Sequence, residues 1–427
     1  MIFSIKCKEN NTNKVLLIEY NNATNKFTDK DGKILNKGKR LNKYEPIKTL
    51  NSSNIKTLEL LLGLKCNFKC NYCAQRNIDQ KKIPDTTPKK VESFIQMLAE
   101  SRLDLERISL MGGEPFVYWK GIKKLVPLLR EKYKQADIRL ITNGSLLDKD
   151  KVEELLKYDV KIHISYDGAN SDRHEDILTK EKIVDAIRML DRIRLMRTLS
   201  SATSTNQQII KNFKSKGLIV NHISIQPIRS YNGNASDTKL LDKSRILQLK
   251  EEQKKLYDIL TSAEAQNEPI ANEIFAKTKK RFEDHAKRIM QSSSLDGDFS
   301  YCRMANAQSC VCDIDGIIWD CSCRPEKSIG TIRDLTMGVK IDLSKVYKNY
   351  YLFRRQCLEC PFVIVCAGAC SKPSEETIDF QVSCRNAKAI AEVEFLFAVE
   401  KAYGIRIIEV KTKHANKLIG NYEYLYN

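Results

Sequence analysis

Three cysteines, Cys66, Cys70 and Cys73, share the short segment "CNFKCNYC", directly after the apolar run "LELLLGL". Three thiolates on one loop can hold three irons of a cubane iron–sulfur cluster, whereas a structural metal site normally supplies four ligands and closes the metal. The spacing therefore predicts a cluster in which one iron is open to an exchangeable ligand. A zinc site with a remote fourth ligand is the alternative interpretation.

A second group of cysteines lies toward the end of the chain, where ten of the 14 cysteines fall between residues 300 and 385. This region has little helical periodicity. In a reducing compartment such thiols are metal ligands more often than disulfides. The pattern predicts a small fold held together by metal, with zinc as the rival of iron–sulfur clusters. Cys7 stands apart and is left unassigned.

The apolar runs, the N-terminus and the net charge limit which kinds of protein and partner the sequence allows. No apolar run approaches the length of a membrane span, and the N-terminus lacks the basic and apolar regions of a signal peptide. We therefore expect a soluble, cytoplasmic protein with no membrane partner. The formal net charge of +18 would by itself favour nucleic acid. The lysines are spread widely, however, and thiolate-bound clusters would cancel part of the charge, so nucleic acid is disfavoured and an acidic peptide remains compatible.

Alternating segments between residues 57 and 228 must position the first cysteines. Short apolar runs predict strands at 58–64, 107–113, 138–144, 161–168, 198–203 and 221–228. Amphipathic stretches predict helices at 89–102, 121–134, 148–158, 181–197 and 206–217. Such a series predicts an α/β fold whose parallel sheet curls into a partial, TIM-like (β/α)6 barrel. Active sites of these barrels lie at the carboxyl ends of the strands, where the first cysteines follow their strand.

The rest of the chain completes a predicted division into five regions. Short β segments are predicted at 14–20 and 32–35, a polar helical stretch at 243–294, and a closing helix at 385–404. The regions are an N-terminal β-rich extension (1–55), the partial barrel (56–235), a helical bridge (236–299), a cysteine-rich iron–sulfur domain (300–390) and a C-terminal helix and tail (391–427).

The first cysteines and the ends of the next predicted strands together resemble the radical S-adenosylmethionine superfamily. The family spacing is C-x3-C-x-aromatic-C, with Tyr72 in the aromatic place. The segments "GGEP", "TNG" and "SYDG" then end the second, third and fourth strands in the family order. The resemblance implies that Cys66, Cys70 and Cys73 hold the catalytic 4Fe–4S cluster. It also implies that S-adenosylmethionine is bound by Tyr72, Gly112, Gly113, Glu114, Asn143, Ser165 and Asp167.

In this family the "GGEP" segment binds the methionyl amino group of the cofactor, and the serine of "SYDG" faces its carboxylate. The reduced cluster cleaves the sulfonium, and a 5′-deoxyadenosyl radical then removes a hydrogen atom from an unactivated C–H bond. One departure concerns the carboxylate clamp. The family often has "HD" and then an arginine, whereas this chain has His174 and Asp176 without an arginine in that place. His163 is interpreted as a barrel histidine rather than a catalytic one, and Gln226 as a candidate for substrate contact.

The cysteine-rich region resembles the SPASM domain, a C-terminal extension of many radical enzymes. All seven signature cysteines match, including the run "CLECPFVIVCAGAC". The resemblance implies an auxiliary cluster II held by Cys357, Cys360, Cys366 and Cys384. It implies an auxiliary cluster I held by Cys302, Cys321, Cys370 and one more cysteine, for which Cys310 is preferred to Cys312 because it lies further from the turn at Gly316. If neither binds, that cluster has an open iron.

SPASM enzymes are similar to one another in acting on peptides or proteins. We therefore expect three 4Fe–4S clusters, S-adenosylmethionine, a peptide substrate and an external electron donor such as flavodoxin or ferredoxin. The favoured function is a maturase of ribosomally made peptides that forms thioether or carbon–carbon crosslinks. The alternative is a sulfatase-maturating enzyme or another SPASM oxidase in cofactor biosynthesis. The sulfatase branch has an aspartate directly after the cysteine that corresponds to Cys321, where this chain has Ser322 and Asp320 precedes.

Overall fold

A computed structural model of the chain describes residues 1–36, 49–169, 175–199, 204–227, 243–261, 274, 276–290, 304, 307–343, 354–368, 370 and 372–422. The chain folds into two compact units. Unit 1 consists of Met1–Glu45, Pro227–Tyr301 and Lys348–Asn427, and unit 2 of Pro46–Gln226 and Cys302–Tyr347. The predicted region 300–390 contributes to both units, and the boundaries of the five predicted regions stay predictions. Among the described residues, no helix is apolar over a length that could cross a bilayer.

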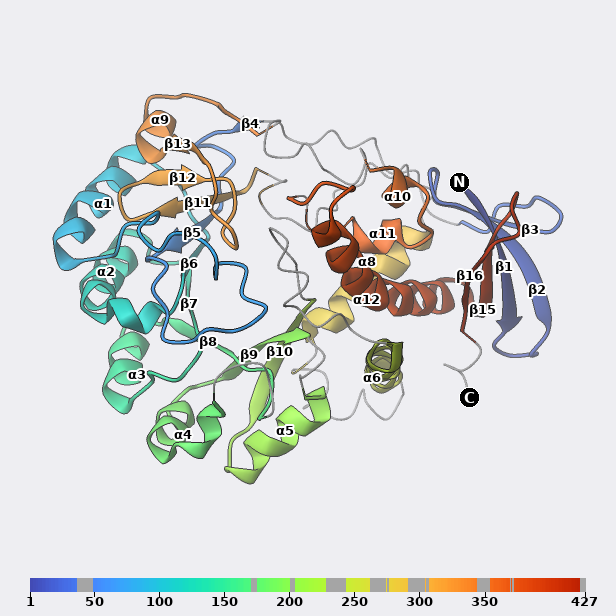
Figure 1. Ribbon diagram of the computed structural model, residues 1–427, viewed down its shortest axis with the longest axis horizontal. Coiled ribbons are helices and arrows are strands. Elements are labelled where there is room, and N and C mark those ends of the chain that lie inside the picture. Colours follow the sequence, from blue (N-terminus) through green and yellow to red (C-terminus); the bar gives the residue numbers. More distant parts are fainter. Residues whose placement is uncertain are drawn as a thin grey trace. The chain divides into compact units, whose positions relative to one another are not determined.

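Unit 2 is built on a nine-stranded sheet with the order β10-β9-β8-β7-β6-β5-β11-β12-β13 (Figure 1). Its strands are β5 (Thr57–Leu61), β6 (Arg107–Met111), β7 (Asp137–Thr142), β8 (Lys161–Ser165), β9 (Ile193–Leu199), β10 (Val220–Pro227), β11 (Ser309–Asp313), β12 (Ile317–Trp319) and β13 (Ser328–Thr331). The pairs from β5 to β9 are parallel, so their carboxyl ends meet at one edge. The predicted α/β class and parallel sheet are confirmed.

Helices connect these parallel strands. They are α1 (Pro88–Ser101), α2 (Trp119–Lys132), α3 (Lys149–Leu156), α4 (Glu181–Arg188) and α5 (Asn206–Ser215), with short 3-10 turns η1 (Pro115–Tyr118) and η2 (Ile177–Thr179). Proline at the first position of α1 suits a helix start, because its missing N–H would be unpaired there anyway. The helix predicted over 181–197 is wrong in its second half. It ends near Arg188, and residues 193–199 form β9 instead of the strand predicted at 198–203.

One strand joins this sheet from far along the sequence. β11 pairs in parallel with β5, with Cys310 opposite Leu58 and Cys312 opposite Leu60. β12 and β13 then extend the sheet as antiparallel strands. The short helix α9 (Ile332–Thr336) follows, and β14 (Ile341–Asp342) pairs with β4 (Thr49–Leu50). Part of the cysteine-rich region thus continues the parallel sheet.

Unit 1 contains a five-stranded sheet with the order β16-β15-β1-β2-β3. Its strands are β1 (Ile2–Glu9), β2 (Val15–Asn21), β3 (Lys26–Asp29), β15 (Ile405–Thr412) and β16 (Leu418–Asn421). The strand predicted at 14–20 is confirmed as β2. The one predicted at 32–35 is wrong, since Ile34 forms only an isolated bridge with Thr28. β15 and β16 were not predicted from the sequence.

The helices of unit 1 are α6 (Lys243–Thr261), α8 (Ala276–Met290), α10 (Arg355–Leu358), α11 (Val363–Cys366) and α12 (Ile378–Tyr403). The long helix α12 packs against α6, α8, α11 and β15. Its apolar side chains share a buried core with β1 and β2, to which Phe3, Tyr20 and Phe395 belong. α12 begins before the predicted closing helix and therefore carries Cys384.

Candidate active site

The loop that follows β5 carries Cys66, Cys70 and Cys73, at the edge where the parallel strands end. Cys66 is exposed and the other two thiols are half-buried, and no disulfide joins them. The loop is folded locally by a hydrogen bond of 3.2 Å from the N–H of Cys73 to the carbonyl of Cys70. Phe68 is buried and anchors the loop to the core. The thiols are thus held at the rim with access from outside.

Hydrogen bonds reach the Cys66 thiol from two neighbours. The N–H of Phe68 lies 3.4 Å from its Sγ, and Nδ2 of Asn143 lies 4.0 Å from it. Burial raises the pKa of this thiol, the nearby Glu114 and Cys73 raise it further, and the contacts with Phe68 and Asn143 lower it. Donors of this kind stabilise the thiolate form that binds metal.

A closed amide–hydroxyl network connects the cysteine loop to the end of β7. Nδ2 of Asn143 donates to Oδ1 of Asn67 at 3.0 Å, and Nδ2 of Asn67 donates to Oγ of Ser145 at 2.8 Å. The Ser145 hydroxyl in turn donates to Oδ1 of Asn143 at 2.6 Å. Sequence reasoning identified Asn143 but missed Asn67 and Ser145, because a single polar residue in a loop has no spacing signature.

Glycines bring the loops after β5 and β6 into backbone contact. Gly112 has φ +145°, and a Cβ there would lie 2.3 Å from the carbonyl oxygen of Gly63. A Cβ on Gly113 would lie 2.2 Å from the carbonyl oxygen of Lys65. The N–H of Gly113 uses this proximity to donate to Gly63 at 3.0 Å. Only glycine permits so close an approach, so these residues hold the cysteine loop against β6.

Glu114 is completely buried beside this contact. Its Oε1 accepts hydrogen bonds from the Thr142 hydroxyl at 2.6 Å and from the N–H of Phe116 at 3.1 Å. Its Oε2 accepts one from the N–H of Asn143 at 2.8 Å. Both carboxylate oxygens therefore bind the chain itself, and they fix the ends of β6 and β7 to each other.

The end of β8 is connected to the cysteine loop through Asp167, which is also completely buried. Its Oδ2 accepts a short hydrogen bond from the Tyr72 hydroxyl, and its Oδ1 accepts one of 2.7 Å from the N–H of Thr198. Ser165 ends β8 in a half-buried position. Within the described part of the chain its hydroxyl has no hydrogen-bond partner, which leaves it available to a ligand.

The other residues considered near the ends of the strands were two histidines, one aspartate and one glutamine. His163 is buried within β8. Asp176 accepts hydrogen bonds of 3.0 Å from the Tyr166 hydroxyl and from the N–H of Leu178, so it caps a turn. Gln226 is half-buried in β10. His174 lies outside the described residues.

Four cysteines of unit 1 surround one hollow. Cys357 of α10, Cys360, Cys366 of α11 and Cys384 of α12 line it, together with Phe362, Val363 and Gly368. Burial raises the pKa of Cys357 to about 12 and that of Cys360 to about 11. It also raises the pKa of Cys366 and of Cys384. The structure therefore brings together all four residues predicted to hold auxiliary cluster II.

The cysteines predicted for auxiliary cluster I are distributed differently. Cys310 and Cys312 are completely buried on one face of β11, and burial raises the pKa of both, to about 12 for Cys310. Cys321 is half-buried after β12 and accepts a hydrogen bond of 3.3 Å from the N–H of Arg324. Cys370 belongs to unit 1, and Cys302 lies outside the described residues. This ligand set stays a prediction.

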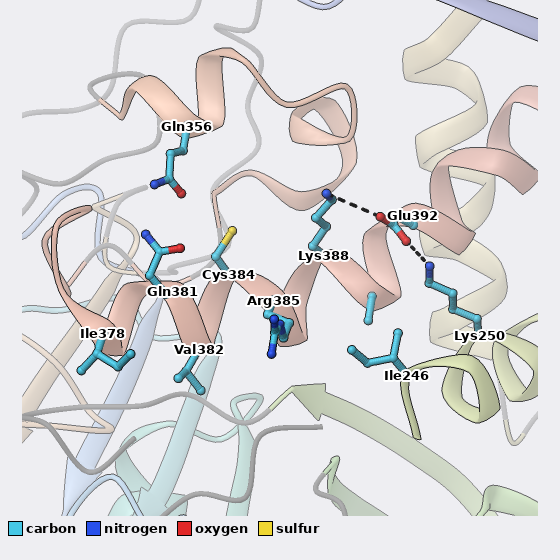
Figure 2. Close-up of a pocket in the computed structure, with 11 residues that line it drawn as sticks. Ile246, Lys250, Gln356, Ile378, Gln381, Val382, Cys384, Arg385, Lys388 and Glu392 are labelled. Atoms are coloured by element: carbon cyan, nitrogen blue, oxygen red, sulfur yellow. Dashed lines mark ion pairs between the residues drawn. The ribbon is translucent and has the colours of Figure 1, made fainter. Parts of the chain in front are cut away.

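A larger cavity of about 520 Å³ opens beside Cys384 (Figure 2). Its wall carries the cations Lys250, Arg385 and Lys388 and one carboxylate, Glu392. Glu392 forms ion pairs with Lys250 and, at 3.7 Å, with Lys388. The excess of positive charge suits an acidic group.

The donor sets fit iron–sulfur groups. The cysteine loop supplies three thiols that are exposed or half-buried. In unit 1 four thiols line a hollow. No three His, Cys, Asp or Glu side chains of the described residues converge on a single-ion site. Four cysteine thiolates are the ligand set of a 4Fe–4S cluster.

Comparisons with known proteins agree with this architecture. Residues 60–224 match the Radical SAM superfamily. The chain is 26% identical over 196 residues to the radical SAM cyclopropyl synthase TigE of Paramaledivibacter caminithermalis, a match over 40% of this chain and 41% of that protein. It is 24% identical over 172 residues to the GTP 3′,8-cyclase of Aquifex aeolicus, covering 39% of this chain and 52% of that protein. The matches thus span about half the length of these relatives.

Two solved structures share the fold. The structure of native anSMEcpe with bound AdoMet aligns with a TM-score of 0.57 and 19% identity, over 82% of this chain and 99% of that one. The structure of Streptococcus suis SuiB bound to S-adenosylmethionine aligns with a TM-score of 0.50 and 15% identity, over 74% of this chain and 73% of that one.

Proposed function

We propose that the chain cleaves S-adenosylmethionine at a 4Fe–4S cluster held by Cys66, Cys70 and Cys73, because residues 60–224 match the Radical SAM superfamily. When bound, the cluster and the nucleotide supply a one-electron reductive cleavage that yields a 5′-deoxyadenosyl radical, which abstracts hydrogen from a substrate. One observation carries the proposal: a loop with three accessible thiols is fixed by glycine contacts and hydrogen bonds to the ends of the next three strands.

The residues around the thiols have separate tasks in this proposal. Gly112 and Gly113 hold the cysteine loop against the end of β6, where the cofactor's amino group binds. The Ser165 hydroxyl, which has no hydrogen-bond partner among the described residues, binds its carboxylate. Tyr72 presents its ring to the nucleotide while its hydroxyl is held by Asp167. Glu114 and Asn143 belong to the binding site mainly as the residues that keep these loops in place.

Two further 4Fe–4S clusters complete the proposal, so that the chain holds three. Cys357, Cys360, Cys366 and Cys384 hold auxiliary cluster II, which the shared hollow supports. Auxiliary cluster I uses Cys302, Cys310, Cys321 and Cys370. Such clusters relay or accept the electron left after hydrogen abstraction. The first electron comes from a flavodoxin or ferredoxin in a reducing cytoplasm, where the thiols are kept from forming disulfides.

The substrate in this proposal is a peptide, and the product is a thioether or carbon–carbon crosslink in a ribosomally made peptide. The net charge of +18 suits an acidic peptide. A sequence relative and a solved structure of the same fold support this proposal. TigE is named a radical SAM cyclopropyl synthase, and anSMEcpe has been solved with the Cp18Cys peptide bound.

Formylglycine formation, as in a sulfatase-maturating enzyme, is the second candidate. The fold shared with anSMEcpe is the observation that favours it. The position of Asp320 argues against it. This carboxylate is 9% exposed, and it accepts hydrogen bonds from the N–H groups of Glu326 at 3.1 Å and Lys327 at 3.2 Å. It fixes the turn after β12, which leaves it poorly suited to serve as a base.

Anaerobic reconstitution with iron and sulfide, followed by dithionite and S-adenosylmethionine, tests the proposed function. We expect the wild-type protein to release 5′-deoxyadenosine and methionine, and the Cys66→Ala/Cys70→Ala/Cys73→Ala variant to release neither. Wild-type protein that holds its cluster but leaves the nucleotide intact would refute the proposal. Mass spectrometry separates the two substrate classes, because a crosslinked peptide loses two hydrogens whereas a sulfatase-derived peptide gains an aldehyde in place of its cysteine side chain.

A further inference from the structure

Arg354 is a buried arginine directly before α10. It is 2% exposed and is among the largest fully buried side chains of the described residues. Its guanidinium donates to the carbonyl oxygens of Gly368 at 2.8 Å, Cys370 at 2.8 Å and Pro373 at 2.6 Å. The face of the Phe380 ring lies 4.5 Å from its central carbon.

These contacts engage the two terminal nitrogens of the guanidinium without neutralising its charge. Carbonyl oxygens and an aromatic face carry no net charge, and none of the described carboxylates forms an ion pair with Arg354. A buried charge without a counter-charge is costly, so such groups are normally paired. Among the described residues, Arg354 is therefore a buried cation without a carboxylate partner.

The groups near the guanidinium that become anionic on binding iron are cysteines. Cys357, Cys370 and Cys384 are its electrostatic neighbours, and Cys357 also accepts a hydrogen bond from it. Two of them, Cys357 and Cys384, line the hollow of four thiols. A 4Fe–4S cluster with four thiolates is net negative, which supplies the missing anion.

We propose that Arg354 is the internal counter-charge of auxiliary cluster II and raises its reduction potential. The proposal rests on the proposed function, because it requires a cluster in this hollow. Reduction adds negative charge to an anionic cluster, so a fixed cation beside it favours the reduced state more than the oxidised one. The effect is strong where water is excluded and the effective dielectric constant is low. Arg354 also acts as a positioning residue, since its planar fork joins Gly368, Cys370 and Pro373 to the start of the helix that carries Cys357.

Lys388 provides a matched comparison on the same hollow. It lies one turn after Cys384 on α12 and is an electrostatic neighbour of Cys360 and Cys384. Its side chain is 38% exposed, and Figure 2 shows its ion pair with Glu392. A cation that is exposed to solvent and paired with a carboxylate has a weaker effect on a neighbour. Lys388 should therefore influence the cluster less than Arg354 does.

The test is an anaerobic redox titration of the reconstituted full-length protein, followed by electron paramagnetic resonance. At a fixed potential we expect Arg354→Gln to lower the ratio of reduced to oxidised auxiliary cluster II about tenfold, which corresponds to about 59 mV for one electron. We expect Lys388→Gln to change the ratio by less than about threefold. A threefold change corresponds to about half of the potential shift expected for Arg354→Gln. Arg354→Lys keeps the charge and should stay close to the wild type. An Arg354→Gln protein with full iron content and an unchanged ratio would overturn the proposal.

The Arg354→Lys variant shows whether a loss of iron in Arg354→Gln comes from the lost charge or from a damaged scaffold. If Arg354→Gln cannot hold the cluster, Arg354→Lys should still hold it, because the counter-charge remains. If both variants lose this cluster, Arg354 is a scaffold residue alone and the proposal is overturned. Failure of the proposed auxiliary clusters would instead be seen in the wild type, as an iron content near four per chain in place of about twelve.

Discussion

The carboxylate of Glu114 accepts a hydrogen bond of 2.8 Å from the backbone N–H of Asn143, a residue in the loop after the next strand of the sheet. The other carboxylate oxygen binds the Thr142 hydroxyl. One buried side chain therefore fixes the loop after β6 to the loop after β7. Since Asn143 in turn contacts Asn67 and Cys66, the cysteine loop depends on the same anchor.

Glu114→Gln should weaken binding of S-adenosylmethionine about tenfold or more. The glutamine amide would present an N–H₂ group where the carboxylate accepts hydrogen bonds, and hydrogen bonds to a buried charge contribute about 1.5–3 kcal/mol. The measurement is the dissociation constant of the nucleotide for reconstituted protein with matched iron content. Glu100→Gln, on the exposed side of α1, is the control and should leave binding unchanged. Equal affinity of both variants would show that Glu114 does not position the site.

Gly113→Ala should remove the radical SAM cluster while the auxiliary clusters remain. A Cβ would lie 2.2 Å from the carbonyl oxygen of Lys65, so the cysteine loop must move. Iron analysis should show a loss of about four irons per chain. Gly217→Ala is the control in the same unit, since nothing lies within 4 Å of a Cβ there. Its positive φ makes it mildly strained, yet it should keep its iron. Full iron content in Gly113→Ala would contradict the role of the glycine contact.

Tyr72→Phe should keep the cluster and bind the nucleotide several-fold more weakly. The change removes only the hydroxyl that donates to Asp167, and a buried acceptor left without its donor costs about 1–3 kcal/mol. Equilibrium titration with S-adenosylmethionine checks the prediction, with Tyr158→Phe as the control. If Tyr72→Phe binds as tightly as the wild type, the orientation of the ring does not depend on Asp167.

Removing two thiols of the hollow should remove auxiliary cluster II alone. Cys357→Ala/Cys384→Ala is expected to lower the iron content from about twelve to about eight per chain. Cys323→Ala, which removes a thiol outside the predicted ligand sets, should not change it. Release of 5′-deoxyadenosine by the double variant should continue, because the radical SAM cluster is separate. An unchanged iron content in the double variant would refute this ligand assignment.

The parts of the site that the sequence predicts are those with a local signature. The spacing of Cys66, Cys70 and Cys73 lies within one loop, and the glycine-rich and polar segments each follow a short apolar strand. The order of strands and helices then places these segments at one edge. The four cysteines of the hollow were predictable for the same reason, since three of them lie within one run of residues.

The parts that could not be predicted depend on partners far apart in the sequence. β11 is a five-residue strand whose place beside β5 is decided by tertiary pairing. Residues 193–199 continue the amphipathic pattern of α4, so the change from helix to strand is decided by pairing with β8. Asn67, Ser145 and Arg354 are single polar residues whose roles follow only from what surrounds them.

The most direct test of the account is the electron paramagnetic resonance of the reduced cluster at Cys66, Cys70 and Cys73, recorded with and without S-adenosylmethionine labelled with ¹⁵N in its amino group. The Cys357→Ala/Cys384→Ala background reduces overlapping signals. The account predicts a changed spectrum on addition of the nucleotide and a hyperfine coupling from the labelled nitrogen, because one iron lacks a protein ligand. A spectrum that is unchanged by the nucleotide, with no coupling to the label, would contradict it.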